Sequence, residues 1–278
     1  MSGLVYKYTR PENWDHFFKK WSIRFTPPED LNDPYDCRPY IYDDGTRLSE
    51  ERCQELKNSK EYVDALKYKY QQSPPDGMSE DEFIEFTSKN FNNLLEILNS
   101  DMSSRIKYSD EMIRYFRANY GVLSLTKKCN DILMWTHYAD SHKGFVVGIY
   151  EHSSMFDGIL QNVKYVEKRP KVSFQDIVND KYNNINKSNI WKYENELRAI
   201  ASFSDNTNID WIDGAIKGIA HLPKSNVACI IFGAAMQDYE IKEKSDAIRS
   251  QDECEHIVLK RVILHPDKFE FVIEPIAQ

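Results

Sequence analysis

The chain has 278 residues, of which 41% are hydrophobic and 13% aromatic, and its formal net charge is −8. This apolar content is sufficient for a sizeable core, so the composition excludes a largely disordered chain. The acidic balance argues against a broad electrostatic surface for nucleic acid or anionic membrane, but it does not exclude a local basic groove.

The N-terminal segment predicts a strand, a helix and a second strand. Residues 4–8 alternate as in a short strand, and residues 9–12 (TRPE) are typical of a capping box with proline in the first helical turn. Four aromatic residues then recur at helical spacing: Trp14, Phe17, Phe18 and Trp21. Residues 22–26 predict a second strand, which leads into a turn-rich loop over residues 27–34.

The composition changes between residues 49 and 120. Charged residues dominate there and β-branched residues become fewer. Helical periodicity occurs in several pieces, for example in the series Phe83, Phe86, Phe91, Leu94, Leu95 and Leu98. We therefore expect a helical insertion over residues 49–120, within a single domain that spans residues 1–278.

The remainder of the chain returns to strand character. Predicted strands cover residues 121–126, 145–150, 163–166, 197–203, 227–232, 257–264 and 269–273. Predicted helices cover residues 131–141, 174–184 and 237–250. Because the strands outnumber those of a regular βαβ alternation, we expect an α+β fold with a mixed, mostly antiparallel sheet.

The cysteines and the apolar runs indicate a cellular location. The five cysteines are odd in number, widely spaced and never arranged as C-x-x-C, which fits a reducing cytosol rather than a disulfide framework or a zinc site. The first residues lack the pattern of a signal peptide, and no apolar run approaches the ~20 residues of a membrane helix. We expect a soluble, cytoplasmic protein with no membrane partner.

Two clusters of polar and aromatic residues lie near the N-terminus. Tyr6 and Tyr8 share one face of the first predicted strand, and with Arg24 they could hold a base and a phosphate. The alternative is an edge strand with half-buried tyrosines and an arginine paired with nearby acids. Asn32 and Asp33 precede a proline, where they could fix a turn or offer oxygen atoms to hydroxyls or a cation.

A third cluster joins a strand to the helix that follows it. Ser124 and Thr126 present two hydroxyls on one strand face. Trp135 could belong to the core, whereas His137 and His142 make the connection after the helix unusually polar. Two histidines five residues apart do not share a helical face, so a zinc pair is not indicated.

A fourth cluster contains two glutamates and an arginine. Glu194, Glu196 and Arg198 would project from one face of a strand that begins here. The two carboxylates favour an acid–base or charge-stabilising role. The alternative is a surface ladder that Arg198 neutralises. The same E-x-E pattern occurs over residues 80–82 and 253–255, so only the strand context and aromatic flank distinguish this copy.

These runs together resemble the bacterial "domain of unknown function 2971" family. The residues that carry the resemblance are 6–8, 24–25, 31–36, 134–140, 142–144 and 191–198. The resemblance implies a bacterial or phage-related cytosolic protein, often found in mobile or defence-associated settings.

A looser resemblance gives a sharper functional hypothesis. The ordered set Arg24, Ser124-Leu125-Thr126 and Glu194-Asn195-Glu196 is similar to the arginine, S-x-T/S and E-x-E pattern of ADP-ribosyltransferases. It implies that NAD is the substrate, with Arg24 on the pyrophosphate and the two hydroxyls supporting the pocket. Glu196 would stabilise the oxocarbenium-like ribosyl centre, while Glu194 would orient the acceptor. The residues expected to bind the nucleotide are Tyr6, Tyr8, Arg24, Asn32, Asp33, Ser124, Thr126, Trp135, Tyr138 and His142, and those expected to be catalytic are Glu196, Glu194 and His137.

Three functions remain open at this point. The first is an NAD-dependent ADP-ribosyltransferase-like effector or toxin of bacterial or phage conflict systems, which modifies protein or nucleic acid. The second is a non-catalytic sensor that binds a nucleotide or a phage component through the same clusters. The third is a nucleotide or nucleic-acid hydrolase, in which His137, His142, Asp33 and Glu194 form an acid–base or metal site.

Overall fold

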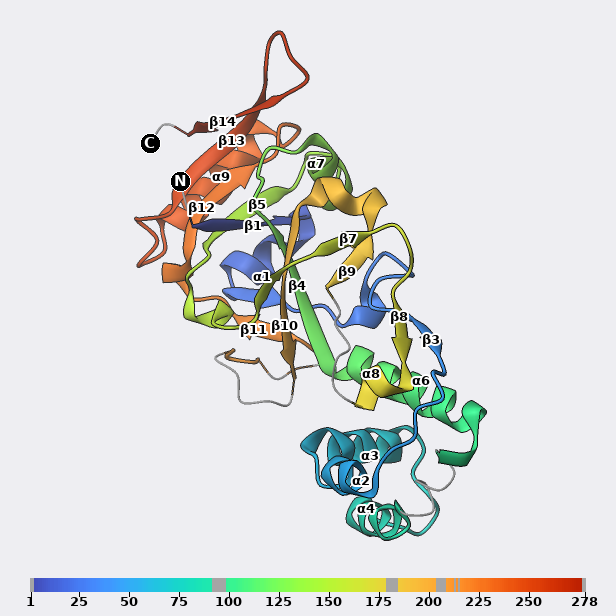
Figure 1. Cartoon of the computed structure of the whole chain (residues 1–278). Coiled ribbons are helices and arrows are strands. Elements are labelled where there is room, and N and C mark those ends of the chain that lie inside the picture. Colours follow the sequence, from blue (N-terminus) through green and yellow to red (C-terminus); the bar gives the residue numbers. More distant parts are fainter. Residues whose placement is uncertain are drawn as a thin grey trace. The chain divides into compact units, whose positions relative to one another are not determined.

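The structure is a computed structural model, which describes residues 3–91, 99–178, 185–203, 209–212, 214 and 216–276 (Figure 1). The chain divides into two compact units by its contacts. Unit 1 comprises Met1–Leu31, Tyr120–Glu167 and Ile185–Gln278, and unit 2 comprises Asn32–Asn119 and Lys168–Asn184. This division concerns contacts alone, so the single domain with an insertion over residues 49–120 stays a prediction.

Unit 1 is organised around a mixed, mostly antiparallel sheet. Within the described residues the sheet has the strand order β14-β13-β12-β5-β1-β4-β10-β6. Its strands are β1 (Leu4–Thr9), β4 (Tyr120–Thr126), β5 (Phe145–Tyr150), β6 (Leu160–Asn162), β10 (Glu196–Ser202), β12 (Val227–Phe232), β13 (Val258–Leu264) and β14 (Phe271–Pro275). β12 and β13 run parallel, whereas the other neighbours are antiparallel. The predicted α+β class is confirmed.

Shorter elements complete unit 1. Two small ladders pair β2 (Ser22–Arg24) with β11 (Ile219–His221), and β7 (Lys164–Val166) with β9 (Asn186–Ser188). The α-helices are α1 (Trp14–Phe18), α7 (Ile132–Tyr138) and α9 (Asp238–Arg249). The 3-10 helices are η1 (Pro11–Asn13), η2 (Pro28–Asp30), η3 (Ser154–Phe156), η4 (Asn189–Glu194) and η5 (Lys224–Asn226).

The central strands of unit 1 are buried on both faces. β5 and β12 read FVVGIY and VACIIF, and nearly every residue of both is buried. Such continuous apolar runs are stable only where both faces of a strand are covered. One covering layer contains the aromatic side chains of α1, because Trp14, Phe17 and Phe18 pack around Phe145 at ring separations of 5.2–5.9 Å.

The start of the first helix differs from the predicted capping box. Arg10 occupies the N-cap of η1 and its side chain makes no capping hydrogen bond. The Thr9 hydroxyl instead accepts a hydrogen bond from the Asn13 amide, at 3.2 Å. Thr9 is the last residue of β1 and lies one position before the N-cap, so its hydroxyl does not cap the helix.

Unit 2 is mainly helical. Its helices are α2 (Glu50–Lys57), α3 (Lys60–Gln72), α4 (Glu80–Lys89), α6 (Met102–Asn119) and α8 (Phe174–Val178). Ser49, Ser59 and Ser79 cap α2, α3 and α4 through their side-chain oxygens. β3 (Tyr40–Tyr42) and β8 (Lys171–Ser173) form a parallel pair. The predicted helical residues Leu94, Leu95 and Leu98, and residues 179–184, lie outside the described part of the chain.

Candidate functional site

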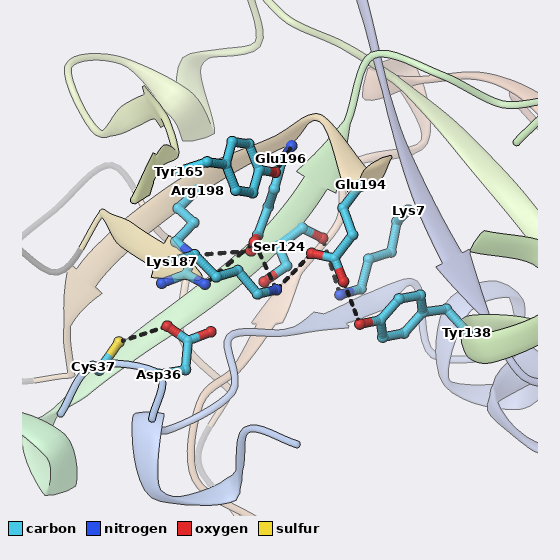
Figure 2. A network of polar contacts seen from close by, with 10 residues as sticks. All are labelled: Lys7, Asp36, Cys37, Ser124, Tyr138, Tyr165, Lys187, Glu194, Glu196 and Arg198. Carbon is cyan, nitrogen blue, oxygen red and sulfur yellow. Dashed lines mark hydrogen bonds and ion pairs between the residues drawn. The ribbon is translucent and has the colours of Figure 1, made fainter. Parts of the chain in front are cut away.

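Unit 1 contains a buried network of opposite charges, which we call the ion-pair cluster (Figure 2). Its members are Ser124, Lys187, Glu194, Glu196 and Arg198. They come from β4, β9, η4 and β10. All four charged side chains are buried, and Arg198 has no exposed surface. Buried charges are retained only where they are paired and hydrogen-bonded, so the geometry of these contacts decides what the cluster can do.

The local backbone brings the two glutamates together. η4 ends at Glu194, and β10 begins at Glu196. Asn195 between them adopts the left-handed conformation, with φ 45° and ψ 51°, which asparagine tolerates better than most residues. The strand predicted to contain both glutamates therefore begins at the second one. The turn at Asn195 nevertheless leaves both carboxylates facing the same lysine.

One ammonium group bridges both carboxylates. Lys187 Nζ donates to Glu194 Oε2 at 2.5 Å and to Glu196 Oε2 at 3.0 Å. Tyr138, at the end of α7, donates its hydroxyl to Glu194 Oε1 at 2.5 Å. The two glutamates thus share one cation but differ in their other partners.

Arg198 binds the Glu196 carboxylate through two hydrogen bonds. Its Nε donates to Glu196 Oε1 at 2.9 Å, and its Nη2 donates to Glu196 Oε2 at 3.2 Å. Arg198 and Glu196 on β10 lie opposite Ser124 and Thr126 on β4, so these four side chains share one face of the sheet. The Ser124 hydroxyl also hydrogen-bonds the Glu196 carboxylate. Bidentate arginine contacts fix both the position and the ionisation of a carboxylate.

These different surroundings shift the pKa values of the two glutamates in opposite directions. Burial raises the pKa of Glu194 above its ordinary value, and the Lys187 charge does not cancel that effect. Burial acts in the same direction on Glu196, but the charges of Arg198 and Lys187 outweigh it and lower the pKa of Glu196 to about 2. Adjacent carboxyls whose pKa values are pushed apart can take separate roles, one as a proton carrier and the other as a permanent anion.

Two further side chains border the cluster. Lys7 on β1 donates from Nζ to the Ser124 carbonyl oxygen at 3.1 Å. Burial of this ammonium lowers the pKa of Lys7 to about 8, even though the charges of Glu196 and Glu194 oppose the shift. Tyr165 accepts a hydrogen bond from the Glu196 backbone N–H at 2.8 Å. Burial raises the pKa of Tyr165 to about 12, so this hydroxyl is neutral at physiological pH.

The structure brings together some of the residues predicted for the site. Ser124, Tyr138, Glu194 and Glu196 meet directly through the contacts above. Thr126 is on the adjacent strand opposite Glu196, where its hydroxyl accepts from the Lys128 backbone N–H at 3.2 Å.

Arg24 has a different partner from the one that the transferase resemblance implies. It lies on β2, outside the main sheet, and its exposed side chain pairs with Asp30, with Nη2 2.6 Å from Oδ2. The arginine that contacts Glu196 is instead Arg198, two residues along the same strand.

Tyr6, Tyr8 and Trp135 belong to an apolar cluster of unit 1. The Tyr8 and Trp135 rings meet edge to face with centroids 5.3 Å apart, and Tyr6 packs against the same group. Trp135 is fully buried, and its indole N–H donates to the Cys129 carbonyl oxygen at 2.9 Å. The core interpretation of Trp135 matches this placement.

The two histidines face aromatic rings. The His137 ring is 6.2 Å from the Tyr193 ring, and His142 lies 5.4 Å from Phe271. His142 Nε2 is 3.2 Å from the Thr136 hydroxyl oxygen. Burial lowers the pKa of His142. Within the described residues, no group of three or more His, Cys, Asp and Glu side chains is arranged to hold a metal ion.

Asn32 and Asp33 lie in unit 2. Asp33 is buried, and its Oδ1 accepts the Tyr35 backbone N–H at 2.9 Å, which is the turn-forming arrangement. Asn32 is exposed beside it.

Lys187, Lys7 and Tyr165 are site residues that the sequence reasoning missed. Lys187 follows a segment without strong periodicity, and its partners lie seven and nine residues further along the chain. Lys7 lies between Tyr6 and Tyr8, so on β1 it points to the opposite face from these tyrosines. Lys7 is on β1, which β4 separates from β10, and no local sequence signal marks Lys7 or Lys187 as a partner of the glutamates.

The fold and the cluster define an α+β protein with a buried carboxylate–cation network. Residues 134–199 match the family described as "Protein of unknown function (DUF2971)". The matched segment holds Tyr138, Lys187, Glu194, Glu196 and Arg198, which is most of the ion-pair cluster. No curated protein and no solved structure matches the chain. Among the described residues, no helix has the length and apolarity needed to cross a membrane.

Proposed function

We propose that the chain is an NAD-consuming transferase, which cleaves the nicotinamide–ribose bond and passes ADP-ribose to a protein or nucleic-acid acceptor in bacterial or phage conflict. The observation that carries the proposal is the pair of adjacent buried glutamates that share Lys187, where Arg198 also holds Glu196 and Tyr138 bonds Glu194; their pKa values are shifted in opposite directions. Glycosyl transfer requires both properties, because a fixed anion stabilises the oxocarbenium-like centre while a second group moves a proton.

The proposed chemistry assigns one role to each glutamate. The bond from the ribosyl C1′ to the nicotinamide nitrogen breaks, and its electron pair leaves with neutral nicotinamide. Glu196, held ionised by Arg198 and Lys187, faces the developing positive charge at C1′. The acceptor then forms its bond to C1′ and gives its proton to Glu194, whose raised pKa suits proton uptake. Ser124 and Tyr138 position the two carboxylates.

The test is transfer of label from NAD, radiolabelled in the adenylate, to the protein and nucleic-acid fractions of a bacterial lysate. Wild-type protein should label one fraction, and Glu196→Gln should abolish the signal. Glu255→Gln is the matched control, because it changes the second glutamate of an exposed E-x-E sequence. Full labelling by a folded Glu196→Gln protein would reject the assignment.

Glu196→Gln leaves two buried cations with less compensation, so its fold has to be checked by thermal unfolding. If the variant is unfolded, Ser124→Ala provides a milder test. It removes one hydrogen bond to Glu196 and retains every charge of the cluster. We expect Ser124→Ala to reduce labelling while the melting temperature changes little.

A non-catalytic nucleotide-binding module is the second candidate. All four carboxylate oxygens of the cluster already accept hydrogen bonds from Tyr138, Lys187 or Arg198. A buried network in which every carboxylate oxygen has a hydrogen-bond partner is rigid, and rigidity favours a binding role over a catalytic one. This function predicts that NAD raises the melting temperature without being consumed, whereas release of nicotinamide would exclude it.

A further inference from the structure

Unit 2 presents exposed tyrosines beside basic residues, a combination that neither the core nor the ion-pair cluster uses. We call Tyr35, Arg38, Tyr40, Tyr42, Arg169 and Lys171 the tyrosine–arginine surface. The side chains of Tyr35, Tyr40 and Tyr42 are 66%, 52% and 38% exposed. Burial of apolar surface therefore does not explain why three aromatic side chains are placed here.

The short β3–β8 pair orders part of this surface (Figure 1). Tyr40 and Tyr42 point to one face of β3, while Ile41 points to the other. Tyr40 is paired with Lys171 of β8, so an exposed lysine accompanies the first tyrosine. Side chains two residues apart on a strand are about 6.6 Å apart, which is close to twice the ~3.4 Å spacing along a nucleic-acid strand. One unpaired base therefore fits between the two rings.

Arg169 fixes the part of the surface around Tyr35 and Arg38. Its guanidinium lies over the Tyr35 ring, 5.6 Å from the centroid. Its Nε donates to the Arg38 carbonyl oxygen at 2.7 Å, and its Nη2 donates to the Pro39 carbonyl oxygen at 3.1 Å. Two hydrogen bonds and a cation–π contact thus hold Arg169 and Tyr35 in place before any ligand arrives.

The local charge is opposite to that of the whole chain. Residues 35–42 and 168–171 contain Arg38, Lys168, Arg169 and Lys171, all exposed. The one acid in these two segments, Asp36, is buried. A phosphate backbone would meet four cations within these two segments, which exposed acids, Asp44 and Glu167, flank in the sequence.

We infer that the tyrosine–arginine surface binds single-stranded nucleic acid, with bases stacked on the tyrosines and phosphates near the basic side chains. Stacking on aromatic rings beside a basic track is the general means of binding unpaired strands without sequence preference. A duplex hides its base faces, so it offers these tyrosines nothing to stack on. This inference uses none of the residues of the ion-pair cluster and is independent of the proposed transferase activity.

The test measures fluorescence anisotropy of a labelled 12-nucleotide oligo(dT) with the full chain, at about 50 mM and about 200 mM salt, against a duplex of equal length. We expect the single strand to bind more tightly than the duplex, and more weakly at the higher salt concentration. Combined Tyr40→Ala and Tyr42→Ala should weaken binding at least tenfold, since stacking on each ring contributes roughly fivefold or more. Lys171→Gln should weaken binding and make the salt dependence less steep.

Two exposed residues supply the controls. Tyr239→Ala changes an exposed tyrosine of α9, and Lys107→Gln changes an exposed lysine of α6. Neither should affect binding. Absence of binding at the lower salt concentration would overturn the inference, as would equal binding of duplex or equal effects of the control variants. Because the substituted side chains are exposed, unchanged melting temperatures are expected throughout.

Discussion

Arg198 holds Glu196 through two hydrogen bonds, Nε to Oε1 at 2.9 Å and Nη2 to Oε2 at 3.2 Å, and both side chains are buried. The contact joins two residues on the same face of β10. Because both charges are buried, each depends on nearby opposite charges for its compensation.

Replacing Arg198 should therefore strongly destabilise the protein. Arg198→Met leaves Glu196 buried with less compensation, and we expect the free energy of unfolding to fall by about 3–5 kcal/mol. Urea denaturation followed by circular dichroism measures the change. Arg24→Met is the control, because Arg24 forms an exposed pair with Asp30 that should contribute less than about 1 kcal/mol. Equal losses in the two variants would contradict the importance of burial.

Lys7 should give stability a specific pH dependence. Its folded-state pKa of about 8 lies below the ordinary value of 10.5, so between these limits the unfolded chain binds more protons. The contribution of Lys7 to the free energy of unfolding therefore rises as pH increases from about 8. Lys7→Met should remove that rise, whereas Lys128→Met, at an exposed site, should retain it. Denaturation at a series of pH values from 7 to 10 gives the free energy of unfolding of the wild type and of both variants. If this free energy changes with pH in the same way in the wild type and in Lys7→Met, the lowered pKa of Lys7 is refuted.

The Tyr138 hydroxyl should lower the pKa of Glu194. Its hydroxyl hydrogen bond favours the ionised carboxylate, so Tyr138→Phe should raise the pKa of Glu194 further. Carbon NMR of protein labelled in the glutamate carboxyls follows that titration directly, with Glu194→Gln to assign the signal. Tyr239→Phe, an exposed change on α9, should leave the titration in place. A downward shift in Tyr138→Phe would mean that the hydroxyl does not donate to Glu194.

Gly144 should not tolerate a side chain. A Cβ atom there would lie 2.2 Å from the Thr9 carbonyl oxygen and 3.0 Å from the Ala139 Cα, and both of these are backbone atoms. Gly144→Ala should lower the free energy of unfolding by about 1–3 kcal/mol or more, because the backbone has to move. Gly214→Ala is the control, since no described residue places an atom within 4 Å of its added Cβ. Thermal unfolding gives the comparison, and equal melting temperatures would contradict the close approach.

Much of the fold could be predicted because local patterns reflect burial. The strand predicted over residues 145–150 matches β5, and that over residues 227–232 matches β12. Both strands are continuous apolar runs, which are stable only where both faces of the strand are buried. The helix predicted over residues 237–250 contains α9, whose N-terminus carries a capping box formed by Gln237 and Glu240. Short strands such as β6 and β11 were not predicted, since three residues carry too little periodicity.

For the candidate site, the sequence by itself placed Glu194, Glu196 and Arg198 within five residues and Ser124 on a strand. The folded contacts were needed to show that Lys187 bridges the two glutamates, that Tyr138 donates to Glu194, and that Arg24 pairs with Asp30. The physical reason is that the interaction energy of two charges depends on their separation and on the water around them. For Glu196 the fold sets both quantities, because it brings Lys187 of β9 to 3.0 Å from the carboxylate and buries the side chain.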